Sequence, residues 1–405
     1  MKTLLLAWRY LWSRPLGAVL NLLLLSLGLA SITFLVLVGA QLSKAFDRDL
    51  AGIDVVVGAK GSPMQLILSG VLHIDVPPGN VPLKAVNALS KNPLVDRIIP
   101  ISLGDNFAGY RIVGTSLAYI DHYGAKLAQG RVWDAGVPMQ VVLGATTARK
   151  LGLQLGQTFV GSHGLGAGGH THGDNPYTVV GILAPSGSVL DRLILTDTAS
   201  VWKVHEDYTA SPDDSDEDRA VMQEEREITM ALVKYKTPMA ALSFPRFVNT
   251  STEMQAAAPA LEITRLLHML GLGTDVLRAF AGVLLLTAGL SVFIALWSAV
   301  RERRTDLALL RMLGAPPRRV AALLLSEALW LGLLAAVLGL LLGQGLAALL
   351  AWLLALDNSL LIGGMVWPAA LWVIPALALG VSLLSALLPT FAAYRVSVLE
   401  LLQSR

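Results

Sequence analysis

The sequence predicts a membrane protein with four transmembrane helices and a large α+β extracytoplasmic domain, which is inserted between the first and second helices. Three observations support this fold class. The chain of 405 residues is 54% hydrophobic and only 15% charged, whereas a globular domain carries about 25% charged residues. Its uncharged residues are gathered in four long runs, and a long segment of mixed polarity separates the first run from the second.

The charge-free runs define the predicted spans. No charged residue occurs between Arg14 and Lys44, between Arg278 and Arg301, between Glu327 and Asp357, or between Asp357 and Arg395. A membrane-spanning helix needs about 20 apolar residues, so we expect spans at residues 16–41, 279–300, 321–352 and 369–393. The first run is longer than the apolar core of a signal peptide, which is typically ~7–15 residues, although Val38-Gly39-Ala40 has the small residues of a cleavage site.

The basic residues predict the orientation. Residues 1–15 carry only basic charges, the segment 301–320 carries six arginines and the tail 394–405 carries two, whereas the loop 353–368 carries no lysine or arginine. Because short cytoplasmic loops are enriched in these residues, both ends and 301–320 are predicted in the cytoplasm, with 42–278 and 353–368 outside. We therefore expect a multi-pass protein of the bacterial inner membrane. The lack of cysteine excludes disulfides and thiol chemistry.

The outer segment 42–278 predicts an α+β domain, arranged in two lobes. Short β-branched or apolar runs begin at Asp54, Gln140, Tyr177, Arg192 and Ile228 and predict strands. A short helix is expected at 145–151, before Gly152, and a helix followed by a turn at 61–80. Residues 40–52 and 252–278 are predicted to be helical and to form a stalk next to the spans. A flexible linker on each side of the domain is the alternative.

The charged segment 301–320 predicts a short amphipathic helix at 305–314. Thr305 suits the N-cap and Asp306 suits the positive end of the helix. Gly314 can end the helix, and Pro316-Pro317 is expected to prevent it from resuming. The apolar stripe of this helix consists of Leu307, Leu310 and Leu313. Such a helix either lies on anionic lipid or docks into a groove of another protein.

The loop also resembles a known family. The residues Glu302-Arg303-Arg304-Thr305-Asp306-Leu307-Ala308-Leu309-Leu310-Arg311-Met312-Leu313-Gly314 are similar to the cytoplasmic loop of permeases of the FtsX/MacB/LolC-LolE type. The order of the spans and Ser326-Glu327-Ala328 extend the resemblance. It implies a permease subunit that forms a dimer with a second permease copy and uses this loop to engage a cytoplasmic ABC ATPase.

The resemblance further implies that ATP hydrolysis on the partner, with its magnesium, moves the periplasmic domain. The implied cargo is apolar or amphipathic: a lipoprotein, lipid, peptide or haem-like molecule, which is exported or extracted, with a periplasmic binding protein or lipoprotein as a further partner. The chain has no G-x-x-x-x-G-K-[ST] phosphate loop, so we expect no enzymatic activity, and no nucleic-acid partner. An FtsX-like scaffold that activates a cell-wall hydrolase is an alternative, but the large outer domain favours transport.

Three further features are candidate sites. Glu327 lies in the third span, where an acid is a functional candidate; we favour a structural or coupling role over substrate contact. The glycine-rich segment 161–174 holds His163, His170, His172 and Asp174, which could bind zinc and would suggest a metal-linked transport or sensing system. A solvated insertion is the alternative. Residues 206–227 hold ten acids and predict a solvated insertion or a docking surface for a basic partner.

Overall fold

The structure is a computed structural model, and it describes residues 2–13, 15–163, 175–209, 225–302, 312–356 and 367–394. The chain divides into two compact units. The helical unit comprises Met1–Ser43, Met269–Leu353 and Gly363–Arg405, and the α/β unit comprises Lys44–His268 together with Leu354–Ile362. The sequence prediction of four apolar helices and a large α+β domain is confirmed.

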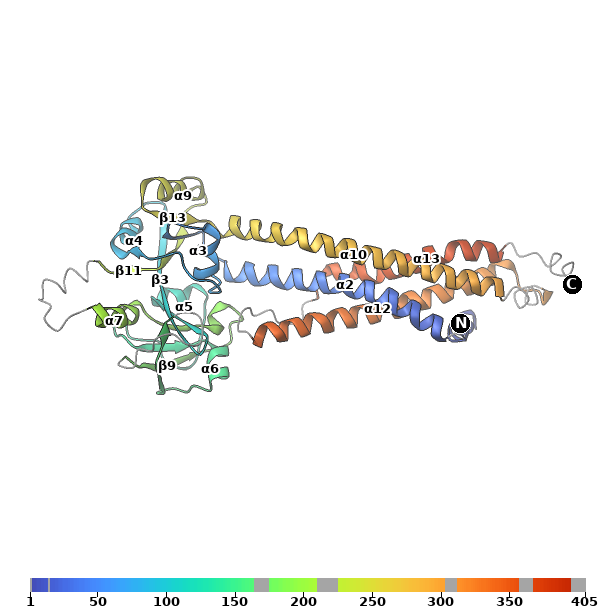
Figure 1. Cartoon of the computed structure of the whole chain (residues 1–405), viewed down its shortest axis with the longest axis horizontal. Coiled ribbons are helices and arrows are strands. Elements are labelled where there is room, and N and C mark those ends of the chain that lie inside the picture. The colour runs from blue at the N-terminus through green and yellow to red at the C-terminus, as the bar shows by residue number, and fades with distance from the viewer. Residues whose placement is uncertain are drawn as a thin grey trace, which may run out of the picture. The chain divides into compact units, whose positions relative to one another are not determined.

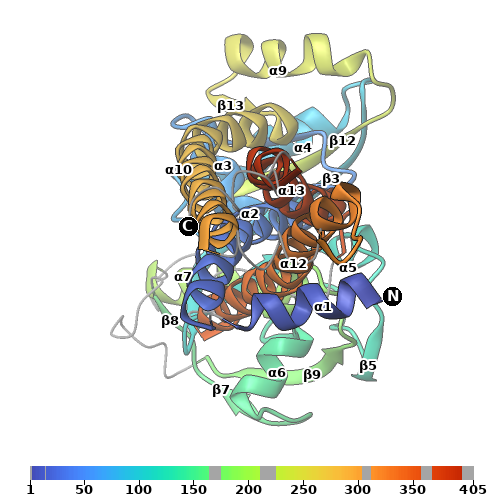
Figure 2. The same cartoon turned by 90° about the vertical axis from the view of Figure 1, so that its right-hand side faces the viewer.

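Four helices of the described chain are long and apolar enough to cross a membrane. They are α2 (Pro15–Asp49), α10 (Pro259–Glu302), α12 (Pro317–Leu356) and α13 (Val373–Tyr394), the last preceded by the short helix η2 (Ala369–Trp372). These helices run side by side in both views (Figures 1 and 2). The helices α2, α10 and α12 are longer than their predicted spans because residues on one or both sides continue the helix. The helix α13 begins four residues later than predicted, since η2 occupies the start of the predicted span.

Small residues let the helices of this unit approach closely. Gly339 of α12 faces α2, and a Cβ atom added at Gly339 would lie 2.6 Å from the Cβ of Leu29. Ser291 of α10 donates a hydrogen bond of 2.6 Å to Oδ1 of Asn21 in α2. Without a hydrophobic driving force between lipid-embedded helices, such close packing and polar contacts drive their association.

A helix that the sequence analysis missed precedes the first span. The residues of α1 (Lys2–Leu11) form a separate helix, which lies across the direction of the long helices (Figure 2). The indole Nε1 of Trp330 in α12 donates to the backbone oxygen of Leu4, and the rings of Trp8 and Trp330 pack edge to face with centroids 5.1 Å apart. Ala7 and Leu11 are buried, so their spacing of four residues was the signal for this helix.

One mixed sheet organises the α/β unit. Its strands are ordered β13-β1-β12-β3-β4-β10-β6-β9-β5, with β7 paired to β9 and β8 paired to β3. The pairs β4–β10 and β6–β9 are parallel. The strands are β1 (Val55–Ala59), β3 (Val95–Phe107), β4 (Tyr110–Thr115), β5 (Leu127–Gly130), β6 (Gln140–Leu143), β7 (Thr158–Phe159), β8 (Ser162–His163), β9 (Tyr177–Leu183), β10 (Ile194–Asp197), β12 (Met230–Tyr235) and β13 (Met254–Ala257), while β2 (Val81–Pro82) pairs with β11 (Glu227–Ile228).

The long strand β3 connects two apolar cores. One core lies around β1, β12 and β13 with the helices α4 (Leu83–Ser90) and α9 (Ala240–Ser251). The helix α3 (Pro63–Gly70) also contacts these strands. The other lies around β4, β6, β9 and β10 with α6 (Ala145–Leu151) and α7 (Thr198–Thr209). Figure 1 shows β3 running between these two groups. The two predicted lobes therefore share one continuous sheet.

Local signals placed several elements correctly. The valines at the start of β1 are fully buried, which explains its uninterrupted apolar run. Helix α6 ends at Gly152, whose φ of +66° is the left-handed conformation that favours glycine. Ser62 caps α3 by accepting a hydrogen bond from the backbone nitrogen of Gln65.

Two expectations about helix boundaries were wrong. Residues 252–258 were predicted to begin the helix that leads into the second span, but Met254–Ala257 form strand β13, which pairs with β1; the helix α10 starts only at Pro259. The tertiary pairing overrides the helical pattern. Pro316-Pro317 was expected to prevent a helix from resuming, but Pro317 is the first residue of α12. A backbone N–H at the first position of a helix has no partner within the helix, so proline costs no hydrogen bond there.

Candidate functional site

The predicted ATPase-coupling loop is described only at its two edges. Most of the residues predicted to contact the ATPase lie outside the described residues, namely Arg303, Arg304, Asp306, Leu307, Leu310 and Arg311. On one side, Glu302 is the last residue of α10. On the other side, the side chain of Leu313 is 85% exposed, and Gly314 has a φ of +89°. This left-handed backbone suits the predicted role of Gly314 as the residue that ends a helix.

Glu327, the acid predicted inside the third span, lies in α12 and is only 4% exposed. Its side chain takes part in a polar or electrostatic interaction. The neighbouring Ala328 and Leu331 pack in a cluster with Val292 of α10. The structural or coupling role of Glu327 stays a prediction.

The predicted metal ligands are not brought together within the described chain. Three of the four predicted ligands, His170, His172 and Asp174, lie outside the described residues. For His163 only the backbone is described; it belongs to strand β8 and pairs with Asp105 of β3. Among the described residues, no group of three or more histidine, aspartate or glutamate side chains could hold a metal ion. The zinc site therefore stays a prediction. Most of the acidic segment 206–227 also lies outside the described residues.

The structure reveals a polar site that the sequence analysis missed, at the C-terminal end of α2. Asp49, the last residue of this helix, is only 4% exposed. Its Oδ1 accepts hydrogen bonds from the backbone nitrogen of Val189, at 3.2 Å, and from Nε of Arg48, at 3.1 Å. Its backbone oxygen accepts a hydrogen bond of 2.9 Å from the hydroxyl of Tyr123. One residue thus connects α2 to η1 (Val189–Arg192) and to Tyr123, which directly follows α5 (Leu117–His122).

Two buried arginines hold the neighbouring segment 69–75. Nη2 of Arg192 donates a hydrogen bond of 2.6 Å to the backbone oxygen of Leu72. Arg111 of β4 donates to the backbone oxygens of Ser69, at 3.3 Å, and of Asp75, at 2.8 Å. Backbone carbonyls therefore satisfy guanidinium groups that would be costly to bury without partners.

His73 lies in the middle of this segment with a φ of +54°. Its Nε2 is 3.0 Å from the hydroxyl of Tyr119 in α5, as expected for a buried histidine that serves the fold. The rings of Tyr119 and Tyr123 pack edge to face, with centroids 5.3 Å apart. A chain of contacts therefore runs from Asp49 through the two tyrosines to His73.

Burial dominates the electrostatics of this cluster. Desolvation raises the pKa of Asp49, against the lowering effects of Arg48 and Arg192. Burial, reinforced by the positive charges of Arg111 and Arg192, holds the pKa of His73 well below its usual value. Burial also lowers the pKa of the Arg111 guanidinium to about 10. The imidazole is thus neutral at pH 7, and the charge of Asp49 lies among cations.

We call Asp49, Arg192, Tyr123 and their backbone partners the α2 anchor. It fixes the end of a long helix to two elements that are far away in the sequence. The sequence offered one weak signal for it: an acid at the C-terminal end of a helix opposes the helix dipole, so Asp49 needs a tertiary reason to be there. No sequence pattern indicated which residues would surround it.

Two open grooves lie elsewhere on the α/β unit. One, of about 580 Å³, lies between α4 and α9 and is lined mainly by apolar residues, among them Ala85, Leu89, Phe247 and Met254. The other, of about 680 Å³, lies beside α6 and β9 and includes Arg149 and Gln154. Both volumes fall in the range of small-molecule sites, about 300–1,000 Å³.

Comparisons with known proteins cover both units. Residues 18–243 match the family described as MacB-like periplasmic core domain, and residues 278–398 match the family described as FtsX-like permease C-terminal. No curated protein matches the chain.

Two solved structures are similar to the chain. For the periplasmic region of MacB from Actinobacillus actinomycetemcomitans, the identity is 15% and the TM-score 0.36, over 55% of this chain and 95% of that chain. For the extracellular domain of the noncanonic ABC-type transporter YknZ from Gram-positive bacteria, the identity is 12% and the TM-score 0.31, over 50% of this chain and 98% of that chain.

Proposed function

The chain belongs to the family of permeases that combine a MacB-like periplasmic core domain with an FtsX-like C-terminal region, and on this premise we propose that a separate cytoplasmic ATPase acts through it to move the outer domain. Membership of the family makes the chain a multi-pass permease of the ABC transporter type. The proposal adds the inner membrane as its location, a second permease copy as its partner, and a mechanical stroke rather than a continuous pore as its mechanism.

The loop between α10 and α12 is the contact we propose for the ATPase. Its predicted stripe of leucines ends at Leu313, whose side chain is largely exposed. A continuous apolar stripe rimmed by arginines, as predicted for this loop, is typical of a surface that another protein covers. Because the loop joins two spans directly, a push on it acts on both helices at once.

The α2 anchor supports transmission of the stroke into the α/β unit. A helix moves a domain only when its end is held firmly, and the α2 anchor holds Asp49 by hydrogen bonds from the backbone nitrogen of Val189 and from the hydroxyl of Tyr123. Val189 is itself buried. A displacement of α2 along its axis would therefore be transmitted directly to η1 and to the end of α5.

The groove between α4 and α9 supports an apolar or amphipathic cargo. Most of its lining side chains are aliphatic or aromatic, and the polar exceptions are Lys91, Asn92, Thr252 and Glu253. Phe247, which lines the groove, is 43% exposed. Apolar surface of this kind contributes about 25 cal/mol per Å² when a ligand covers it.

Co-purification tests the ATPase contact. The tagged permease is expressed with a candidate ATPase from the same genome, and Leu313→Asp is expected to reduce the recovered ATPase about tenfold or more, because a charge would be buried in an apolar contact. Leu242→Asp is the matched control, since it introduces the same charge at a similarly exposed leucine of the α/β unit. Equal recovery with Leu313→Asp and with the parent chain, confirmed with Leu310→Asp, would show that the ATPase docks elsewhere.

A further inference from the structure

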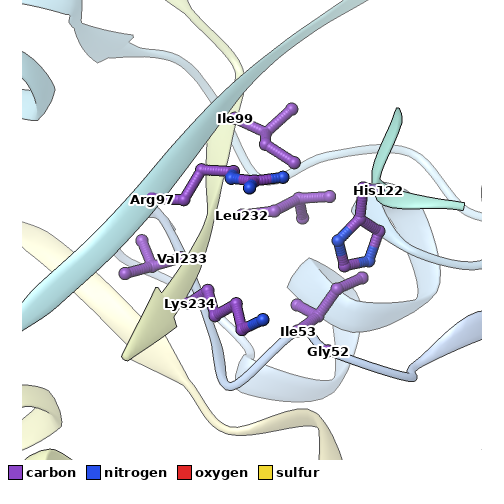
Figure 3. A pocket seen from close by; sticks show the side chains of 8 residues that line it. All are labelled: Gly52, Ile53, Arg97, Ile99, His122, Leu232, Val233 and Lys234. Carbon is purple, nitrogen blue, oxygen red and sulfur yellow. The ribbon is translucent and has the colours of Figure 1, made fainter. Parts of the chain in front are cut away.

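Three basic side chains meet around a small hollow in the α/β unit. Strands β3 and β12 are antiparallel, and Arg97 and Lys234 are direct register partners. The third side chain is His122, the last residue of α5. In Figure 3 the guanidinium of Arg97 and the ammonium of Lys234 reach toward the hollow from one side, and the imidazole lies on the other side.

The hollow has room for a single oxygen-sized atom. Its volume is about 10 Å³, and Ile53, Ile99 and Leu232 form part of its apolar lining. A cavity of this size holds about one water molecule. Gly52 keeps it open on the side of α2: its φ is +77°, and an added Cβ would lie 3.0 Å from Cε1 of His122.

The charges around the hollow are not balanced within the described part of the chain. Like charges placed directly opposite each other on neighbouring strands destabilise the pair. Among the described residues, neither the guanidinium of Arg97 nor the ammonium of Lys234 forms a hydrogen bond or an ion pair. Both side chains are exposed, so they are free to close on a ligand at the mouth of the hollow.

The neighbouring acids do not supply the missing charge. The carboxylate of Asp54 accepts a hydrogen bond of 2.7 Å from the backbone nitrogen of Tyr235. Asp96 precedes Arg97 in a strand, so its side chain points to the opposite face of the sheet. Asp121 is exposed and forms no ion pair with a described residue.

The imidazole of His122 has one polar atom to spare. Its Nε2 is buried and has no hydrogen-bond partner in the structure. A buried polar atom without a hydrogen-bond partner destabilises the folded protein relative to one that is paired. An oxygen atom placed in the hollow would provide that partner.

We propose that Arg97, Lys234 and His122 form a binding site for a phosphate group. One phosphate oxygen occupies the hollow and accepts a hydrogen bond from Nε2 of His122, while two others accept from the arginine and the lysine at its mouth. A phosphate dianion offers three oxygens in these directions, whereas a phosphodiester offers two unesterified oxygens and an ester oxygen as the weaker third acceptor. The negative charge of either group reduces the repulsion across the strand pair. The source is either a phospholipid headgroup or free phosphate. The site does not depend on the ATPase contact or on the apolar groove.

Binding to the full-length chain in an uncharged detergent tests the proposal in two arms. In the first arm, inorganic phosphate is titrated at constant ionic strength and followed by phosphorus NMR line broadening, with chloride as the control anion. In the second arm, native mass spectrometry counts molecules of phosphatidylglycerol bound to the chain, with the zwitterionic phosphatidylcholine as the control lipid.

The double variant Arg97→Gln/Lys234→Gln is expected to weaken binding by at least about tenfold, the loss that corresponds to ~1.4 kcal/mol. The matched control Lys150→Gln/Arg246→Gln removes two exposed cations of the same unit and is expected to leave binding unchanged. Dependence on Arg97 and Lys234 in the first arm alone identifies free phosphate, and dependence in the second arm alone identifies the lipid headgroup. Absence of saturable binding in both arms, or equal binding by both double variants, would overturn the proposal.

Discussion

Replacing Asp49 by alanine tests whether the α2 anchor holds the end of the helix. The side-chain oxygen that accepts from the backbone nitrogen of Val189 is lost, and Val189 is buried. The hydrogen bond from Tyr123 to the backbone oxygen of residue 49 does not depend on the side chain. The variant therefore removes one part of the anchor and leaves another intact.

The expected magnitude follows from these contacts. An unsatisfied buried donor costs about 1–3 kcal/mol. Removing an acid from the C-terminal end of a helix recovers about 0.3–1 kcal/mol. The net loss is about 1–2 kcal/mol in the free energy of local opening, which corresponds to roughly 5- to 30-fold faster amide exchange.

Hydrogen exchange of the full-length chain, measured by mass spectrometry, reports this loss directly. We expect faster exchange in peptides that contain the last turn of α2 and residues 186–192, with unchanged exchange at the distant helix α9. Asp49→Asn is the control, because the asparagine oxygen can still accept from Val189 while the charge is removed. Unchanged exchange at 186–192 in Asp49→Ala would refute the role of the hydrogen bond, and equal acceleration in both variants would assign the effect to the charge instead.

Two further predictions concern packing and pH. Gly339→Ala should lower the Tm of the detergent-solubilised chain, because overpacking against Leu29 costs about 1–3 kcal/mol; Gly345→Ala on the same helix meets nothing within 4 Å and should not lower it. The free energy of unfolding of the α/β unit should fall as the pH drops below about 6.5. Residue 73 then binds a proton in the unfolded chain, whereas the buried His73 of the folded chain stays neutral. The single proton of His73 changes the free energy of unfolding by at most about 1.4 kcal/mol per pH unit. His73→Asn, which tolerates the positive φ, should flatten the denaturant-unfolding profile between pH 6.5 and 5; an unchanged slope would contradict the assignment.

The sequence was sufficient for features that depend on neighbouring residues. The lengths of the charge-free runs predicted four apolar helices, because a span is defined by its own composition. The α6 helix and its end at Gly152 followed from local propensity and from the conformational freedom of glycine. The helix α1 was predictable from its periodicity but was missed, since its basic residues were considered only for orientation.

Only the tertiary structure decided the features that join distant residues. Residues 252–258 have a helical pattern, yet Met254–Ala257 pair with β1 because that strand offers hydrogen bonds and an apolar core. Asp49 meets Val189 across 140 positions of the chain, and Arg97 meets Lys234 through the register of β3 and β12. A sequence pattern reports which face of an element is apolar, but it does not report which element will cover that face. Composition and periodicity therefore determined the spans and most strands of this protein, whereas sheet pairing determined its anchor and its basic hollow.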